Sequence, residues 1–289
     1  MPQLDPDFIE RGYNNRAAFP DYPQWFERWA AASDVLRTRV DSRLDLRYGN
    51  SPRQTLDIFA AARPQGALLF IHGGYWRALD KSQHSFVAGP LLDRGVSVAV
   101  MNYDLCPAVG IPRIVEECRE AVAWLARHGA EHGMPFKRLV VAGHSDGGHL
   151  VAMLLATDWA AHGVSPQVLA AGAAISGVFD LEPLVQVSFN TDLRLDPATA
   201  RAMSPIHLSP APGVPLLLAA GAQETSEFIR QTQLLWDAWP GCRPAHASGP
   251  LLVPETHHFS VLWDLASPAS DLAKGIEALI PDFNAIEAR

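Results

Sequence analysis

Residues 67–253 alternate continuous apolar runs with stretches of helical periodicity. A short, continuously apolar run is typical of a strand buried on both faces, and such strands occur mainly in parallel sheets. The apolar runs predict strands at Ala67–Ile71, Val96–Asn102, Arg138–Ala142, Ala170–Ser176, Pro215–Ala220 and Pro250–Val253. The stretches between them predict helices, chiefly at Ser82–Arg94, Pro112–His132, Gly148–Ala160 and Ser226–Trp239. We therefore expect an α/β protein with a mostly parallel central sheet and helices on both faces.

The beginning of the chain has a different pattern. Apolar residues recur at helical spacing from Pro23 to Val40, so residues 1–40 are expected to form a helical segment packed on the main domain. Two short strand-like segments follow, at Leu44–Tyr48 and Thr55–Phe59. The turn residues between them, Gly49–Pro52, favour an antiparallel hairpin that leads into the sheet.

A segment rich in proline and polar turns interrupts the alternation at residues 180–212. It falls between the sixth and seventh predicted strands, and we expect it to form a small cap over the strand ends, where such sheets bind ligands. The chain has 289 residues, 48% of them hydrophobic, and no internal repeat, so residues 1–289 are expected to form one large domain.

A glycine-rich turn, GHSDGG at residues 143–148, joins a predicted strand to a predicted helix. It has the GxSxG pattern of a nucleophile elbow, in which a serine hydroxyl projects from the top of a sheet. The serine of such a turn has a strained backbone, and we expect side chains at Gly143 and Gly147 to collide with the neighbouring strand and helix. The pattern predicts Ser145 as a catalytic nucleophile.

A second glycine motif, HGGYW at residues 72–76, follows the strand Ala67–Ile71. Hydrolases with a serine elbow build an oxyanion hole at this place, because glycine lets backbone N–H groups approach the developing negative charge closely. We assign the donors to the N–H groups of Gly74, Tyr75 and Asp146, and we expect His72 to hold the loop through a hydrogen bond. The alternative is a structural Gly-Gly turn with its aromatic pair packed behind it.

A serine nucleophile needs a histidine to accept its proton and an acid to orient that histidine. In proteins with a serine elbow the chain order is serine, acid, histidine. Glu224 lies in the turn after the seventh predicted strand, whereas Glu227 begins the next helix, where an acid is ordinarily a capping partner. Position therefore favours Glu224, and it does not choose between His257 and His258 as the base.

The charge and composition of the chain favour a small-molecule substrate over nucleic acid. The formal net charge is −8, and lysines and arginines form no cluster that could contact phosphates. The three cysteines leave an odd number and form no CxxC pair, which suits a reducing compartment. Since the sequence also lacks a secretory signal and a membrane-spanning apolar run, we expect a cytoplasmic protein with no membrane partner.

Other histidines are expected to be structural. His128 and His132 have the spacing of metal ligands on a helix, but no third ligand with a recognisable pattern accompanies them. His144 and His149 flank the elbow and are expected to pack in position. We expect no metal and no cofactor, and the sequence leaves a homodimer open.

With these motifs in place, the chain resembles the serine-dependent arylformamidases, or kynurenine formamidases, and their bacterial relatives in the α/β-hydrolase superfamily. HGGYW is the specific part, and further matching segments lie at residues 13–16, 52–57, 102–107 and 224–228. The resemblance maps the base onto His258 and the acid onto Glu224. Many relatives have alanine after the nucleophile where this chain has Asp146. A carboxylate inside the oxyanion hole would oppose the developing charge, so we expect this side chain to point away into a polar contact.

The resemblance implies a serine hydrolase that cleaves an aryl formamide such as N-formylkynurenine through an acyl-enzyme, as a step of tryptophan catabolism. We expect the aromatic part of the substrate to lie against Trp76 and Phe189. A general short-chain carboxylesterase is the alternative, because an ester uses the same catalytic groups. A weaker alternative is a non-catalytic binding protein on the hydrolase scaffold.

Overall fold

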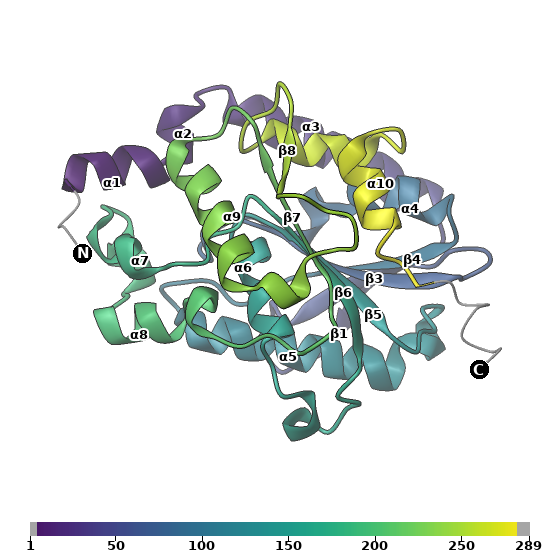
Figure 1. Ribbon diagram of the computed structural model, residues 1–289. Coiled ribbons are helices and arrows are strands. Elements are labelled where there is room, and N and C mark those ends of the chain that lie inside the picture. The colour runs from purple at the N-terminus through teal and green to yellow at the C-terminus, as the bar shows by residue number, and fades with distance from the viewer. Residues whose placement is uncertain (1–4, 282–289) are drawn as a thin grey trace.

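A sheet of eight strands crosses the middle of the molecule in the computed structural model, which describes residues 5–281 (Figure 1). Its order is β1-β2-β4-β3-β5-β6-β7-β8. Strand β2 is antiparallel to β1 and β4, and all other neighbours are parallel. The strands are β1 (Ser42–Arg47), β2 (Thr55–Phe59), β3 (Gly66–Ile71), β4 (Val96–Met101), β5 (Leu139–His144), β6 (Leu169–Ile175), β7 (Leu216–Gly221) and β8 (Leu251–Val253). A hairpin that leads into a mostly parallel sheet confirms the predicted α/β-hydrolase fold.

Helices cover both faces of the sheet (Figure 1). They are α1 (Pro6–Tyr13), α2 (Asn15–Ala18), α3 (Tyr22–Arg39), α4 (Gly89–Leu92), α5 (Ile111–His128), α6 (Asp146–Leu155), α7 (Asn190–Leu193), α8 (Pro197–Ala202), α9 (Ser226–Ala238) and α10 (Asp271–Glu277). Alternate residues of β3 enter two apolar cores: Leu69 and Ile71 pack with α5, α6 and α9, and Leu68 and Phe70 pack with α3 and α10. Burial on both faces explains why the strands are continuously apolar.

The predicted helix at Ser82–Arg94 is broken in the structure. Two short 3₁₀ turns, η1 (Lys81–Gln83) and η2 (Ser85–Ala88), precede α4. Pro90 lies in the first turn of α4. Proline has no N–H to donate and its ring clashes with the carbonyl group four residues earlier, so a helix accepts it in the first turn but is broken by it in the interior.

Two segments lie beside the carboxyl ends of the strands. The first is N-terminal: α1 contacts α9 and the 3₁₀ turn η5 (Glu182–Gln186), and α3 packs on η1 and η2. The second joins β6 to β7 and holds η5, α7, α8 and η6 (Pro205–His207). In Figure 1, α1 and α7 lie at the same end of the molecule. Within residues 5–281, no helix has the length and hydrophobicity needed to cross a membrane.

Candidate active site

The predicted elbow is the turn between β5 and α6. Ser145 has a left-handed backbone there, with φ 57° and ψ −123°. A Cβ atom on Gly143 would lie 2.3 Å from the carbonyl oxygen of Gly147, and a Cβ atom on Gly147 would lie 2.1 Å from the carbonyl oxygen of Ile71 in β3. These distances confirm that the turn requires glycine at both positions.

The side chains of Ser145, His258 and Glu224 form one hydrogen-bonded chain. His258 Nε2 lies 3.1 Å from Ser145 Oγ, and His258 Nδ1 lies 2.9 Å from Glu224 Oε2. The other Glu224 oxygen accepts hydrogen bonds from the Gly221 N–H at 2.8 Å and from the Ser176 hydroxyl. The Glu224 carboxylate is fully buried, so these donors hold it in place against the imidazole. The order hydroxyl, imidazole, carboxylate is the one that turns serine into a nucleophile.

The two competing residues have other partners. The ring of His257 stacks on Phe19 with centroids 4.6 Å apart, and its Nε2 lies 3.2 Å from the Asp21 carboxylate. Glu227 lies in the first turn of α9 and pairs with Arg230 at 2.8 Å. The structure thus brings His258 and Glu224, rather than their neighbours, to Ser145.

The loop after β3 encloses the side chain of Asp146. Tyr75 and Trp76 have left-handed φ angles of 55° and 54°, so their N–H groups converge. They donate to the two Asp146 carboxylate oxygens at 2.6 and 3.0 Å, and the Tyr103 hydroxyl donates at 2.8 Å. Successive N–H groups in this conformation form an anion-binding concavity, and here a carboxylate of the same chain fills it. Burial raises the pKa of Asp146 to about 6, although the three hydrogen bonds oppose that shift.

The expectation that Asp146 points into a polar contact is confirmed, and it corrects one predicted oxyanion donor. The Tyr75 N–H donates to Asp146 and is therefore not available to a substrate. The predicted N–H donors that remain are those of Gly74 and Asp146. Gly74 has φ 130°, and a Cβ atom there would lie 2.2 Å from the Ala78 carbonyl oxygen, so only glycine fits this position.

The two predicted substrate-binding residues lie in different places. Phe189 lines the pocket beside Ser145, and its ring centroid is 4.6 Å from that of Tyr75. Trp76 is fully buried in the core, where its indole meets the ring of His149 in α6 edge to face at 5.0 Å. The prediction for Trp76 is wrong, because the loop directs its side chain into the core and it does not line the pocket.

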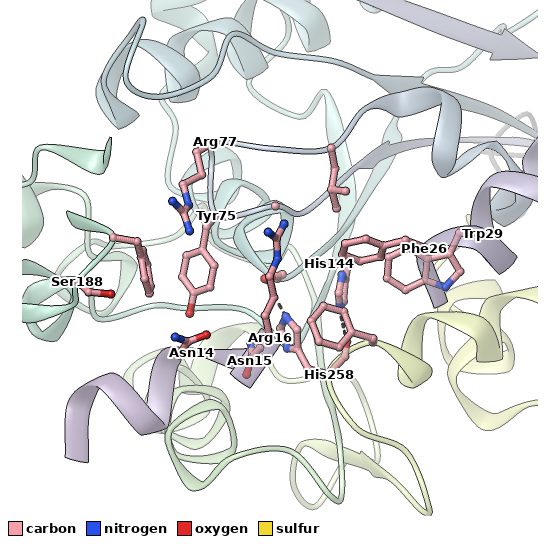
Figure 2. Close-up of a pocket in the computed structure, with 15 residues that line it drawn as sticks. Asn14, Asn15, Arg16, Phe26, Trp29, Tyr75, Arg77, His144, Ser188 and His258 are labelled. Atoms are coloured by element: carbon pink, nitrogen blue, oxygen red, sulfur yellow. Dashed lines mark hydrogen bonds between the residues drawn. The ribbon is translucent and has the colours of Figure 1, made fainter. Parts of the chain in front are cut away.

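The pocket also has a wall that sequence reasoning missed. Its N-terminal contributors are Asn14, Asn15, Arg16, Phe26 and Trp29. In Figure 2, Asn14 lies near Tyr75, whereas Phe26 and Trp29 lie on the far side of His144 from Tyr75. Helical periodicity indicates that this segment packs on something, but not that it packs beside the catalytic serine. The only signal was the match of residues 13–16 to the arylformamidases.

The other histidines support the site or pack elsewhere. His144 Nε2 lies 2.7 Å from the carbonyl oxygen of His258, and His72 contacts the Gly73 carbonyl oxygen at 2.7 Å. Burial lowers the pKa of His72 to about 4, so its imidazole is neutral at pH 7. His128 and His132 both lie against the ring of Trp124. Across residues 5–281, no three His, Cys, Asp or Glu residues form a group suited to a metal ion.

Comparisons with known proteins agree with this geometry. Residues 56–194 match the BD-FAE family. The chain is 27% identical to the kynurenine formamidase of Salmo salar over 84% of its length and 87% of the relative, and 28% identical to that of Danio rerio over 82% and 87%. A crystal structure of a proposed thioesterase from Silicibacter sp. TM1040 is 33% identical, with a TM-score of 0.82 over 93% of this chain and 98% of the other.

The chain belongs to the α/β-hydrolase superfamily, among the relatives of the kynurenine formamidases. The predicted resemblance is therefore confirmed, and so is the prediction that the protein is a serine hydrolase.

All three of its cysteines are buried free thiols.

Proposed function

We propose that this hydrolase cleaves small aryl formamides of the N-formylkynurenine type through an acyl-enzyme. The observation that carries the proposal is the hydrogen-bonded chain of Ser145, His258 and Glu224 beside a pocket with aromatic walls. The kynurenine formamidases of two fishes, similar over most of this chain, support the choice of a formamide. Phe189 and Tyr75 offer apolar surface to the aryl group of such a substrate.

In the proposed mechanism, Ser145 Oγ attacks the formyl carbon while His258 Nε2 accepts the serine proton. The carbonyl oxygen becomes an oxyanion, which the N–H groups of Gly74 and Asp146 stabilise. The carboxylate of Glu224 stabilises the imidazolium, which then donates its proton to the aryl nitrogen as the C–N bond breaks. Water, deprotonated by His258, attacks the formyl-serine and releases formate.

The proposal extends to the setting of the reaction. We place the enzyme in tryptophan catabolism and in the cytoplasm, where three buried free thiols would stay reduced. We treat residues 1–289 as one domain in which residues 180–212 act as the cap, since Phe189 of this segment lines the pocket. Its partner is a small-molecule substrate, with no nucleic acid or membrane involved.

The test is a comparison of kcat/KM for N-formylkynurenine and p-nitrophenyl acetate. A formamide preference that disappears in Ser145→Ala supports the proposal. Ester cleavage without formamide cleavage would make the enzyme a short-chain carboxylesterase, the second candidate, which the relationship to a proposed thioesterase favours.

Labelling by a fluorophosphonate addresses the remaining alternative, a binding protein on a hydrolase scaffold. Only an activated serine reacts with this probe. Wild-type protein should be labelled at Ser145, and a wild-type protein that stays unlabelled would contradict any serine-based catalysis.

A further inference from the structure

Three aromatic rings contact the imidazole of His258, and one of them also donates a hydrogen bond. The ring centroids of Phe228, His144 and Phe259 lie 4.5, 4.8 and 5.2 Å from that of His258. The two phenylalanines offer apolar contact alone. His144 Nε2 lies 2.7 Å from the carbonyl oxygen of His258, so this side chain holds the backbone of the catalytic base as well as its ring (Figure 2).

His144 connects the base to the nucleophile. It is the last residue of β5 and directly precedes Ser145, whereas His258 lies in the loop after β8, 114 residues later. Strand β5 is fully buried between β3 and β6, while β8 is a three-residue strand at the edge of the sheet. The hydrogen bond therefore ties a loop residue at the edge of the sheet to the central strand that carries the nucleophile.

His144 is neutral in this arrangement. A carbonyl oxygen only accepts hydrogen bonds, so Nε2 of His144 carries the proton. The residue is 3% exposed, and burial, together with the nearby charge of His258, holds the pKa of His144 well below its usual value. When His258 takes the serine proton and becomes an imidazolium, a neutral ring beside it does not oppose the new charge, as a protonated ring would.

Packing alone does not account for a histidine at this position. Trp29 of α3 meets the His144 ring edge to face, with centroids 6.2 Å apart. An apolar side chain would fill this space without the cost of burying a polar ring. What the imidazole adds is the N–H that reaches the His258 carbonyl oxygen.

The distance between base and nucleophile leaves little tolerance. His258 Nε2 lies 3.1 Å from Ser145 Oγ, and a general base works at about 2.6–3.2 Å from the atom that gives up the proton. A misplacement of about 1 Å lowers a rate about a hundredfold. We infer that His144 is a positioning residue of the reaction, whose N–H holds the His258 backbone so that the imidazole reaches Ser145 Oγ. The same role applies to formamides and to esters, because both need this base.

His149 is a matched control for a test of this role. It is fully buried, and its Nε2 lies 2.8 Å from the carbonyl oxygen of Met203. The two histidines thus make the same kind of hydrogen bond, one on each side of Ser145. Met203 belongs to the segment between β6 and β7, so the bond from His149 does not hold the catalytic base.

The test compares glutamine and phenylalanine at each histidine. Glutamine keeps an N–H donor in the place of Nε2, and phenylalanine keeps a ring without a donor. The kcat for a cleaved formamide or ester should fall about ten- to hundredfold in His144→Phe and less than about threefold in His144→Gln. His149→Phe should lower the Tm about as much as His144→Phe, because each loses one buried hydrogen bond, with kcat within about threefold of wild type. A kcat that falls no further in His144→Phe than in His149→Phe would overturn the inference, and so would a His144→Gln as slow as His144→Phe.

The rate at which a fluorophosphonate labels Ser145 gives a second readout that needs no substrate. Because the probe reacts only with an activated serine, the rate should fall in His144→Phe and recover in His144→Gln. This readout still tests His144 if N-formylkynurenine is not cleaved, so failure of the inference can be told apart from failure of the proposed function. If His144→Phe does not fold, His144→Leu removes the donor in its place. Equal labelling rates in the wild type and in the variant without the donor would overturn the inference.

Discussion

Replacing Asp146 with alanine should change the conformation of the loop after β3, which carries the oxyanion donor Gly74, while leaving Ser145, His258 and Glu224 in contact. The carboxylate accepts hydrogen bonds from the Tyr75 and Trp76 N–H groups and from the Tyr103 hydroxyl. The Tyr103 hydroxyl can donate instead to the His72 carbonyl oxygen at 2.9 Å, so the two N–H donors are the ones that lose their partner. Each buried donor left unpaired costs about 1–3 kcal/mol, so the two together give roughly 2–6 kcal/mol as an upper bound if no water replaces the carboxylate. Left-handed backbone costs about 1–3 kcal/mol more for each non-glycine residue, so the loop should relax.

Relaxation of the loop displaces the N–H of Gly74, which is one residue from Tyr75. Loss of one oxyanion donor typically lowers kcat by about 10²–10³-fold. We expect Asp146→Ala to lower kcat about a hundredfold and also to raise KM, because the loop that relaxes carries Tyr75, which lines the pocket. The kcat of Asp146→Asn should lie between those of the wild type and Asp146→Ala. The asparagine oxygen can still accept one hydrogen bond from the loop, but its N–H₂ group faces a second donor.

Steady-state kinetics on N-formylkynurenine or a cleaved ester, together with thermal unfolding, measures this effect. Asp158→Asn, an exposed carboxylate that caps a short turn, is the control for loss of one negative charge. If Asp146→Ala keeps a kcat within about threefold of wild type, the carboxylate does not position the loop and the reasoning is refuted.

Three further predictions follow from the same site. Glu224→Gln should lower kcat by about 10⁴-fold, whereas Glu227→Gln should lower it by less than about threefold. A larger loss of kcat in Glu227→Gln would mean that Glu227, and not Glu224, is the catalytic acid. Phe189→Ala should raise KM while Trp76→Phe leaves KM nearly unchanged, so a larger KM effect at Trp76 would contradict its inward orientation. Burial lowers the pKa of His149 to about 4. The neutral imidazole therefore contributes to the free energy of unfolding fully above about pH 6.5, and this contribution is lost as the pH falls towards 4. The loss is about 3 kcal/mol by pH 4.5. The Tm difference between wild type and His149→Gln should therefore change in favour of the variant from pH 7.5 to 4.5, and a constant difference would contradict this.

Features that depend on local pattern were predictable from the sequence. Strands buried on both faces are continuously apolar, and a glycine beside a strained serine follows from steric contact, as at Gly147. The chain order of Ser145, Glu224 and His258 follows from the order of the strand ends in this fold.

Features that depend on distant contacts were not predictable. The left-handed backbone of Tyr75 and Trp76 is held by a carboxylate about 70 residues away, so neither the blocked Tyr75 N–H nor the inward Trp76 ring is visible in the motif. Likewise, the helical pattern of the N-terminal segment does not reveal that Asn15 meets the cavity of Ser145.

The most direct test of the account is turnover of N-formylkynurenine by the wild-type enzyme and by Ser145→Ala. The account predicts rapid release of kynurenine and formate by the wild type and a loss of several orders of magnitude in the variant. Near-normal turnover by Ser145→Ala would contradict the assignment of the nucleophile. A wild-type enzyme that cleaves esters but not this formamide would contradict the proposed substrate.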